Sequence, residues 1–384
     1  MMSRFAFDDT ACEALAHRHG TPLFAYRGAV AEGAFRRLRA ALPPRVRLAY
    51  AVKANPHPVL LRRFADLGAS FDCASGGELR RVAALGLPKG RVFYAGPAKR
   101  AWELALALDL GARIQAEGWE DLERLEALAP GPVAVNLRIH PAGGAEEASP
   151  ILGGTGPSAF GVDEEEAPGI LARARRLRKV RIAGLHVFAA SNQREADRLL
   201  ATHRYVMDLA QRLREDHGLA FDLIDLGGGL GVPYGPDQGE LDVKALGRGL
   251  GALLEDHAGF QGDLVLEPGR YLAAACGVYL ARVVRAKASR GQRFVLLEGG
   301  VNHLLRPLLT GEPFPVKAVG KGGPSRPATL AGPLCTSLDR LGTVDLPEVA
   351  AGDLLAFGMT GAYGFTEAMS AFLSHPPPLE VWQA

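Results

Sequence analysis

Short apolar segments alternate with longer segments in which apolar residues recur every three or four positions over the first 270 residues of the chain. The first pattern is typical of buried strands, and the second is typical of amphipathic helices. We predict eight strands, at 47–52, 70–73, 91–94, 113–115, 133–139, 182–188, 223–226 and 264–266. We predict helices at 58–65, 77–85, 101–109, 119–128, 167–177, 195–215 and 243–254.

Eight strands that alternate with helices within about 220 residues match the arithmetic of a (β/α)₈ barrel. A doubly wound open sheet has the same alternation and is the main alternative. From about residue 275 the pattern changes to strands without long helices between them, and 22–26 is a further strand that would join them. We therefore predict an α/β fold, with a (β/α)₈ TIM barrel over 28–270. An antiparallel β domain, a sandwich or a barrel, would comprise 271–384 together with 1–27.

Composition and charge exclude several classes of protein. The 384 residues are 48% hydrophobic and 22% charged, which is typical of soluble globular proteins. Lys and Arg number 44 against 42 Asp and Glu, so the net charge is only +2. The chain therefore lacks the excess of basic residues that is typical of nucleic-acid-binding proteins. The sequence has neither a transmembrane stretch nor a signal peptide. The four cysteines lack metal or redox spacing, so we expect a cytoplasmic protein with reduced thiols and no metal, nucleic-acid or membrane partner.

Polar residues follow or end several predicted strands, where barrel enzymes place their catalytic groups. Lys53 follows the first strand, Asp72 lies in the second, and His186 lies in the sixth. The seventh strand leads into the glycines 227–229, and Glu267 follows the eighth. The Gly- and Ala-rich segment 140–157 is expected to form a mobile loop at the same face.

Each of these residues also has a structural interpretation. Lys53 would then be a solvated lysine at the rim, and the glycines would form a tight turn between a strand and a helix. Arg270 would neutralise Glu267, and His186 would be a histidine of the core. Taken together, a nucleophilic lysine, N–H donors for a phosphate and an acid for a ring nitrogen are the groups that pyridoxal phosphate requires.

Six motifs occur in order between residues 49 and 365: AYAVKANPHPVLL, FDCASGGELRRV, DLGGGLG, EPGRY, GPLCTSLDRLG and GAYGF. They resemble the fold-type III pyridoxal-phosphate decarboxylases, the family of diaminopimelate and ornithine decarboxylases. The resemblance implies an alanine-racemase-like barrel with a β domain, pyridoxal 5'-phosphate as cofactor and an amino-acid substrate. It also implies a homodimer with shared active sites.

The resemblance assigns roles to individual residues. Lys53 would bond to the cofactor with Asp72 beside it, His186 would stack on the ring, and Glu267 would pair with the ring nitrogen. Cys335, from the partner subunit, would protonate the substrate carbon after carbon dioxide leaves. The remaining cofactor-binding residues would be Gly228, Gly229, Gly269, Arg270, Tyr363 and, by a looser match because the usual His-x-Gly-Ser run reads HVFAAS, Ser191.

The sequence departs from the family where the distal end of the substrate binds. Thr336 stands where ornithine and diaminopimelate enzymes have an acid, so a distal ammonium loses its partner unless Asp339 or Glu367 substitutes. Arg306 matches an arginine that binds a distal carboxylate, or else it is a surface arginine. The segments CTSLD, HVFAASNQ and FLSHP resemble a divergent branch of the family, which serves secondary metabolism. We therefore expect a substituted, acylated or carrier-protein-linked amino acid as substrate, and diaminopimelate is the alternative.

Two other classes of protein share the barrel. A racemase needs two bases, and the CTSLD and GAYGF motifs favour decarboxylation instead. A noncatalytic relative usually lacks the lysine or the phosphate-binding glycines, and this chain has both. We therefore predict an enzyme that removes the α-carboxylate of an amino acid.

Overall fold

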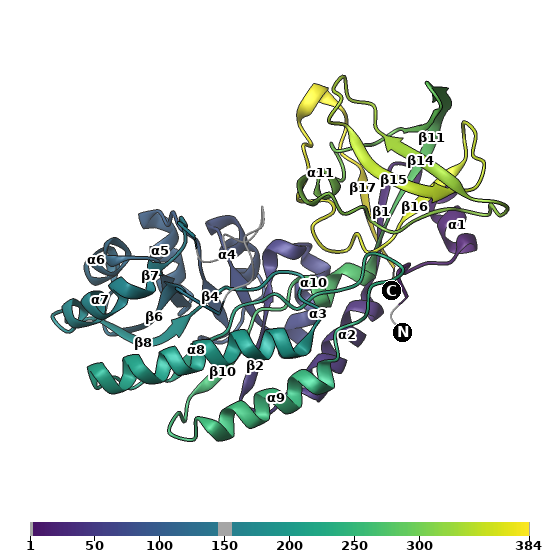
Figure 1. Cartoon of the computed structure of the whole chain (residues 1–384). Coiled ribbons are helices and arrows are strands. Elements are labelled where there is room, and N and C mark those ends of the chain that lie inside the picture. Colours follow the sequence, from purple (N-terminus) through teal and green to yellow (C-terminus); the bar gives the residue numbers. More distant parts are fainter. Residues whose placement is uncertain (1–2, 145–155, 384) are drawn as a thin grey trace. The chain divides into compact units, whose positions relative to one another are not determined.

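The computed structural model describes residues 3–144 and 156–383, so most of the expected loop 140–157 lies outside the described residues. The chain divides into two compact units (Figure 1). One, the barrel unit, comprises Phe35–Val232 and Leu241–Gly269. The other, the β unit, comprises Met1–Ala34, Pro233–Glu240 and Arg270–Ala384.

Eight parallel strands close on themselves in the barrel unit, because β10 pairs with β2 and β5 pairs with β6. The predicted (β/α)₈ barrel is confirmed, and the open doubly wound sheet is excluded. A ninth, two-residue strand, β7 (Val162–Asp163), is added beside β6. The barrel strands are β2 (Val46–Ala51), β3 (Ser70–Cys73), β4 (Val92–Tyr94), β5 (Arg113–Ala116), β6 (Val133–His140), β8 (Val180–His186), β9 (Leu223–Asp225) and β10 (Asp263–Leu266).

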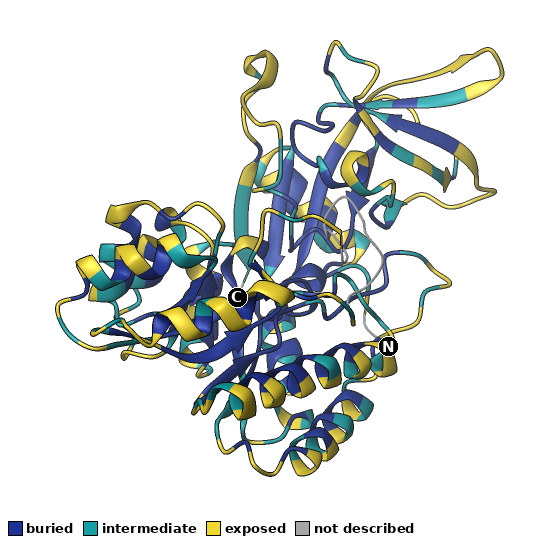
Figure 2. Cartoon of the chain, turned by 60° about the vertical axis from the view of Figure 1, so that its left-hand side comes forward, coloured by how far each residue is buried: buried dark blue, intermediate teal, exposed yellow. Residues whose placement is uncertain are grey.

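The strands form this barrel because most of their residues are buried, and most of these are apolar. Every residue of β3, β4 and β9 is buried, as expected for parallel strands that are covered on both faces. Figure 2 shows the contrast between these buried strands and the exposed outer surfaces of the helices. Polar side chains at the strand ends therefore stand out against an apolar barrel.

The helices begin and end where the sequence provides caps. Ser75 Oγ accepts the N–H of Glu78 at the start of α4, and Asp242 caps α9 in the same way. Gly218 ends α8 in the left-handed conformation. The helices are α3 (Pro58–Asp66), α4 (Gly76–Ala83), α5 (Ala101–Asp109), α6 (Trp119–Leu128), α7 (Ala167–Ala174), α8 (Ala196–His217) and α9 (Val243–Asp256), and α2 (Gly28–Ala41) spans the boundary between the units.

The β unit contains an eight-stranded sheet that is mixed, which corrects the expectation of a purely antiparallel domain. β1 pairs in parallel with β17, and β12 pairs in parallel with β14. The strands β13 and β15 were not predicted. The strands are β1 (Leu23–Arg27), β11 (Gly277–Ser289), β12 (Gln292–Leu297), β13 (Val316–Ala318), β14 (Arg326–Ala331), β15 (Arg340–Leu346), β16 (Leu354–Phe357) and β17 (Leu379–Gln383).

Short helices complete the β unit, and one of them helps to form its core. α1 (Asp9–His19) buries Cys12 and Leu15 against β1 and β11. The others are α10 (Arg270–Ala273) and α11 (Arg306–Thr310). No helix in the described parts of the chain has both the length and the apolar character needed to cross a bilayer.

Candidate active site

The side chains predicted for catalysis lie at one end of the barrel. Lys53 follows β2 in a short 3₁₀ turn, and its Nζ lies 3.8 Å from Oδ2 of Asp72 in β3. His186 ends β8, and its Nε2 lies 3.5 Å from Oε2 of Glu267, which follows β10. Parallel strands direct all their C-terminal ends to the same face of a barrel, so residues that are far apart in the sequence meet there.

Three carboxyl groups are buried at this end of the barrel. Burial and, after it, the charge of Glu267 raise the pKa of Asp72, and Lys53 opposes both, so that the pKa lies at about 8. Burial, followed by the charge of Glu267, also raises the pKa of Asp225 well above its usual range. Burial opposes charge on Glu267, but the nearby His186, Lys53 and Asp225 lower its pKa overall. Glu267 therefore carries the negative charge of the three at neutral pH.

Replacing Asp72 with asparagine is expected to change how the stability of the cofactor-free protein depends on pH. Folding raises the pKa of Asp72 from 3.8 to about 8. Wild-type stability should therefore fall as the pH rises through this window, because the folded state holds a proton that the unfolded state has lost. The asparagine is neutral at every pH. Urea unfolding at successive pH values should show the Asp72→Asn protein gaining stability relative to the wild type as the pH rises.

The matched control for this experiment is Asp66→Asn, because Asp66 is an exposed acid that lies 4.0 Å from Arg62 on the same unit. The difference in the free energy of unfolding between that variant and the wild type should not show the same rise. A difference for Asp72→Asn that stays constant between pH 4 and 8 would contradict the assignment of a buried, protonated Asp72.

The turn 227–229 needs glycine because the backbone closely approaches the segments that follow β8 and β10. Gly229 has φ +93°, and a Cβ there would lie 2.7 Å from the carbonyl oxygen of Ala190. A Cβ on Gly228 would lie 2.8 Å from the carbonyl oxygen of Glu267. Among the described residues, no acceptor is recorded for the N–H groups of Gly228 and Gly229. These two donors are therefore available to an anion.

The loop that carries Ser191 is tied to this turn. The N–H of Gln193 donates to the carbonyl oxygen of Gly229, and the N–H of Gly231 donates to that of Gln193, both at 2.8 Å. Asn192 accepts the N–H of Val232 through Oδ1 at 3.0 Å. The structure thus places the loop of Ser191 beside the glycines, as the predicted role of Ser191 requires.

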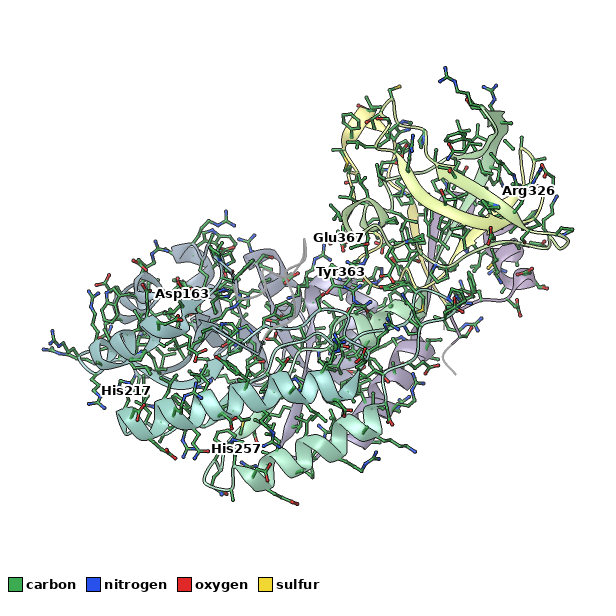
Figure 3. The ribbon with its side chains drawn as sticks, in the orientation of Figure 1. Asp163, His217, His257, Arg326, Tyr363 and Glu367 are labelled. Atoms are coloured by element: carbon green, nitrogen blue, oxygen red, sulfur yellow. The ribbon has the colours of Figure 1, made fainter. Side chains whose placement is uncertain are left out.

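A second cluster of predicted residues lies within the β unit. The ring of Tyr363 lies between two buried guanidinium groups, with the Cζ atoms of Arg270 and Arg306 at 4.7 and 5.2 Å from its centroid. Arg270 Nη1 donates to the hydroxyl of Tyr234 at 2.8 Å, and Arg306 Nη1 lies 3.5 Å from Oε2 of Glu367. Tyr363 has φ +56°, a conformation that bulky residues rarely adopt and that often marks functional sites. Figure 3 labels Tyr363 and Glu367.

The segment 332–339 carries three of the residues predicted for catalysis or substrate binding. Cys335 is exposed and Thr336 is half-buried, whereas Asp339 is buried. Asp339 Oδ1 accepts the N–H of Val301 at 2.8 Å, and Oδ2 accepts the N–H of Leu334 at 2.7 Å. Both oxygens accept backbone N–H groups, so Asp339 holds the fold of this segment, and its substrate contact stays a prediction.

Comparison with known proteins decides the family. The model of the pyridoxal-dependent decarboxylases, pyridoxal binding domain, matches residues 29–274. The chain belongs to this family. It is therefore a pyridoxal-phosphate-dependent amino-acid decarboxylase, as the sequence motifs predicted, and its cofactor is pyridoxal 5'-phosphate.

Relatives of this decarboxylase cover nearly its whole length. L-glutamyl-(BtrI acyl-carrier protein) decarboxylase of Niallia circulans is 31% identical over 97% of this chain and 91% of that protein. Diaminopimelate decarboxylase of Methanothermobacter thermautotrophicus is 33% identical over 96% of this chain and 87% of that protein. The solved diaminopimelate decarboxylase of Helicobacter pylori complexed with L-lysine has a TM-score of 0.88 and 26% identity, covering 97% of this chain and 94% of that one.

The polar atoms of the decarboxylase's barrel fit this cofactor. Asp72 Oδ1, Glu267 Oε1 and both ring nitrogens of His186 are buried and have no hydrogen-bond partner within the described ranges. Buried polar atoms normally have partners, so these atoms indicate a site for a polar ligand. An acid, a histidine ring and free backbone N–H groups match a protonated ring nitrogen, a flat ring and a phosphate.

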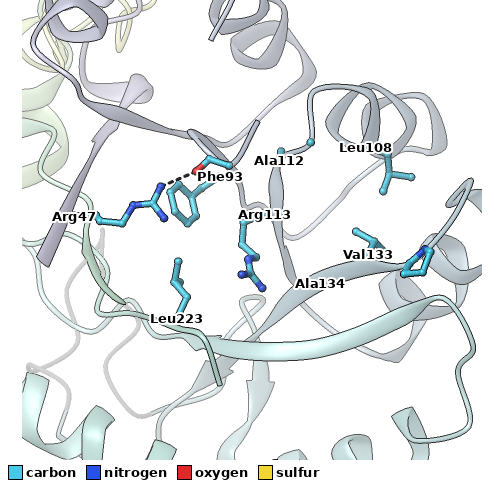
Figure 4. A pocket seen from close by; sticks show the side chains of 11 residues that line it. Arg47, Phe93, Leu108, Ala112, Arg113, Val133, Ala134 and Leu223 are labelled. Atoms are coloured by element: carbon cyan, nitrogen blue, oxygen red, sulfur yellow. Dashed lines mark hydrogen bonds between the residues drawn. The ribbon is translucent and has the colours of Figure 1, made fainter. Parts of the chain in front are cut away.

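A hollow of about 280 Å³ at the opposite end of the barrel does not contribute to this site (Figure 4). The two arginines that line this hollow already have partners within the barrel unit. Arg47 donates to the carbonyl oxygen of Gly90 at 2.6 Å, and Arg113 pairs with Asp222 at 2.7 Å. In barrels, residues at this N-terminal end serve stability rather than catalysis.

Sequence reasoning missed two residues of the decarboxylase site. Asp225 ends β9 inside the quoted DLGGGLG motif, and an acid in an otherwise apolar strand was a signal that could have found it. Phe188 lies with its ring centroid 5.2 Å from Nζ of Lys53. No sequence signal marked Phe188, because an aromatic residue after an apolar strand looks like part of the core.

Proposed function

We propose that this decarboxylase acts on an amino acid whose distal end is uncharged because it is acylated, substituted or linked to a carrier protein. The observation that carries the proposal is the ion pair of Arg306. Its guanidinium is buried, and Nη1 lies 3.5 Å from Oε2 of Glu367. The chain thus supplies its own carboxylate to the arginine that the family uses for a distal carboxylate.

The pairing makes a second carboxylate unfavourable at Arg306. Burial raises the pKa of Glu367, and the charges of Arg306 and Arg270 oppose that rise. A substrate carboxylate at Arg306 would face the like charge of Glu367 or would have to displace it. An amide or thioester carbonyl accepts a hydrogen bond from Arg306 without that repulsion.

A distal ammonium also lacks a dedicated acid in the segment 332–339. Thr336 provides a hydroxyl in place of the family's acid, and the buried Asp339 already accepts two backbone N–H groups. A charge-assisted hydrogen bond contributes about 1.5–3 kcal/mol, and a hydroxyl does not replace it. The relative from Niallia circulans, which acts on a glutamyl group attached to a carrier protein, supports the same reading.

We assign the steps of the reaction to residues at the C-terminal end of the barrel. Lys53 Nζ is the nucleophile toward the cofactor's aldehyde, and Asp72, with a pKa of about 8, exchanges protons with that amine. Burial lowers the pKa of His186, so its neutral ring covers a flat face of the site. Glu267 holds the proton of the ring nitrogen in place. When bound, pyridoxal phosphate accepts the electron pair that the departing carboxylate leaves behind.

The remaining predicted residues complete the assignment. Gly228 and Gly229 donate backbone N–H groups to the phosphate, and Ser191 is assigned to the same group. Gly269, Arg270 and Tyr363 keep the cofactor-binding roles that the sequence predicts. Cys335, an exposed thiol, is the proposed proton donor to the substrate carbon.

A carbon dioxide release assay on the cofactor-loaded protein tests the proposed substrate class. The panel contains meso-diaminopimelate, lysine, ornithine, arginine, glutamate, and γ-glutamyl conjugates. We expect turnover of a conjugate and little release from substrates with a free distal charge. Efficient turnover of meso-diaminopimelate alone would overturn the proposal and identify a diaminopimelate decarboxylase.

Replacing Glu367 with glutamine is expected to shift this preference toward substrates with a distal carboxylate. The change removes the anion beside Arg306 and leaves a free guanidinium. The ratio of kcat/KM for meso-diaminopimelate to that for the preferred conjugate should rise about tenfold or more, which corresponds to a charge-assisted hydrogen bond. Glu312→Gln is the control, because Glu312 pairs with Gln238 in the same unit. An unchanged ratio in Glu367→Gln would contradict the argument from the ion pair.

A further inference from the structure

Asp225 is a buried acid that the proposed mechanism does not use. It is the last residue of β9 and has no exposed surface. Its Oδ1 accepts a hydrogen bond from the N–H of Gly227 at 3.0 Å, and its Oδ2 accepts one from Nε2 of Gln115 at 3.0 Å. A buried acid needs such partners, because burial without them is costly.

The barrel's register holds Asp225 among the active-site groups. Asp225 is paired with His186 across β8 and β9, and Gln115 in β5 approaches it from the barrel interior. One ring nitrogen of His186, one carboxyl oxygen of Asp225 and one of Glu267 lie within 4.8 Å of one another. Asp72 in β3 also acts on Asp225 electrostatically. Glu267 and Asp72, the charged groups that act on Asp225, thus belong to the proposed site.

One carboxyl oxygen of Asp225 and one of Glu267 lie within 4.8 Å of each other in this buried cluster. Two carboxyl groups form a hydrogen bond with each other only when one of them holds a proton. Two carboxylates this close in a buried site do not both ionise readily, so such a pair shares one proton. The balance of burial and charge places that proton on Asp225 and the negative charge on Glu267.

We propose that Asp225 is a positioning residue that, as a neutral acid held by Gln115 and Gly227, donates a hydrogen bond to Glu267 and keeps that carboxylate charged and directed at the cofactor's ring nitrogen. The proposal rests on the role of Glu267 proposed above. It gives the aspartate of DLGGGLG a chemical function beside the phosphate-binding glycines.

The test measures the protonation of the ring nitrogen directly. Protein loaded with pyridoxal phosphate that carries ¹⁵N in its ring is compared by ¹⁵N NMR at neutral pH for the wild type and for Asp225→Asn, Asp225→Ala and Glu267→Gln. The asparagine keeps an N–H donor toward Glu267, and the alanine does not. We expect the protonated-nitrogen shift in the wild type and in Asp225→Asn, and a move toward the unprotonated shift in Asp225→Ala and Glu267→Gln.

Steady-state kinetics adds a second readout. Losing a hydrogen bond to a charged group should lower kcat about tenfold to a hundredfold in Asp225→Ala, with activity largely restored in Asp225→Asn. If Asp225→Asn is as impaired as Asp225→Ala, Asp225 does not act as a neutral donor and the proposal is wrong. If only Glu267→Gln moves the ¹⁵N shift, the proposal fails while the role of Glu267 stands. If Glu267→Gln leaves the shift unchanged, the role of Glu267 itself fails.

Infrared spectroscopy of the cofactor-free protein tests the proton on Asp225 without any activity and without relying on the alanine variant. The difference spectrum between the wild type and Asp225→Asn at neutral pH should show the loss of a protonated carboxyl band. The difference spectrum for Glu267→Gln should show the loss of carboxylate bands instead. Loss of carboxylate bands in Asp225→Asn would overturn the proposal.

Discussion

Replacing Lys53 with alanine should abolish carbon dioxide release, with kcat lowered about 10⁴-fold. Lys53 is the amine at the C-terminal end of the barrel, with its Nζ 3.8 Å from Asp72 and 5.2 Å from the ring centroid of Phe188. Borohydride reduction of the cofactor-loaded wild type, followed by proteolysis and mass spectrometry, should find the cofactor bonded to the peptide that contains Lys53. The alanine variant should yield no such adduct.

Lys53→Arg is the matched variant for this experiment. The arginine keeps a cation facing Asp72 but does not form the covalent bond with an aldehyde, so we expect it to be as inactive as the alanine variant. Lys89→Ala, at an exposed lysine of the same unit, should retain activity. An adduct on another lysine in the wild type, or near-normal turnover in Lys53→Arg, would remove Lys53 from the mechanism.

Replacing Glu267 with glutamine should lower kcat about 10²- to 10³-fold, the usual effect of removing one preorganised electrostatic contact at a reaction centre. The glutamine keeps the size of the side chain and its ability to hydrogen-bond, but it loses the charge that holds the ring nitrogen's proton. The carbon dioxide assay measures the loss.

The Glu267→Gln substitution should also change the pKa of neighbouring acids in the protein without cofactor. The charge of Glu267 raises the pKa of both Asp72 and Asp225. Glu267→Gln should therefore lower the pKa of both acids, which infrared titration of their carboxyl bands would detect. Glu123→Gln, at an exposed acid 3.5 Å from Arg173, is the control for both measurements. Unchanged kcat together with unchanged carboxyl titration would contradict the assigned charge on Glu267.

The barrel could be predicted from the sequence because its strands are buried on both faces. A strand such as Val92–Tyr94 is then a continuous apolar run that contrasts with the helix after it. Eight such strands, each distinct from the helix after it, are compatible with few folds other than a barrel. Only closure itself, the pairing of β10 with β2, required the structure, because a pattern along the chain does not say which edge strands meet.

The β unit was predicted less completely, for a physical reason. β15 alternates between buried and exposed residues over Arg340–Leu346 and contains glycine, so its apolar signal is weak. β13 is three residues long. The parallel pairing of β1 with β17 joins segments more than 350 residues apart, and local patterns carry no information about such partners.

Within the candidate site, the motifs located the side chains but did not reveal their partners. The sequence placed Arg306 and Asp339 among the substrate-binding residues. It did not show that Glu367 pairs with Arg306 or that Asp339 holds backbone at Val301 and Leu334. Partnerships of this kind arise from loops that return to each other in three dimensions, which spacing along the chain does not encode.

The buried carboxyl groups of Asp72 and Asp225 create a trade-off between catalytic activity and stability. Apolar replacements for buried charged groups are often neutral or stabilising when they pack well, and stabilising changes at active sites commonly reduce function. A directed-evolution experiment that rewards heat resistance alone would therefore favour the loss of these acids and produce durable but inactive barrels. Any programme to stabilise this enzyme should hold positions 72, 225 and 267 fixed and look for its gains in the outer helices.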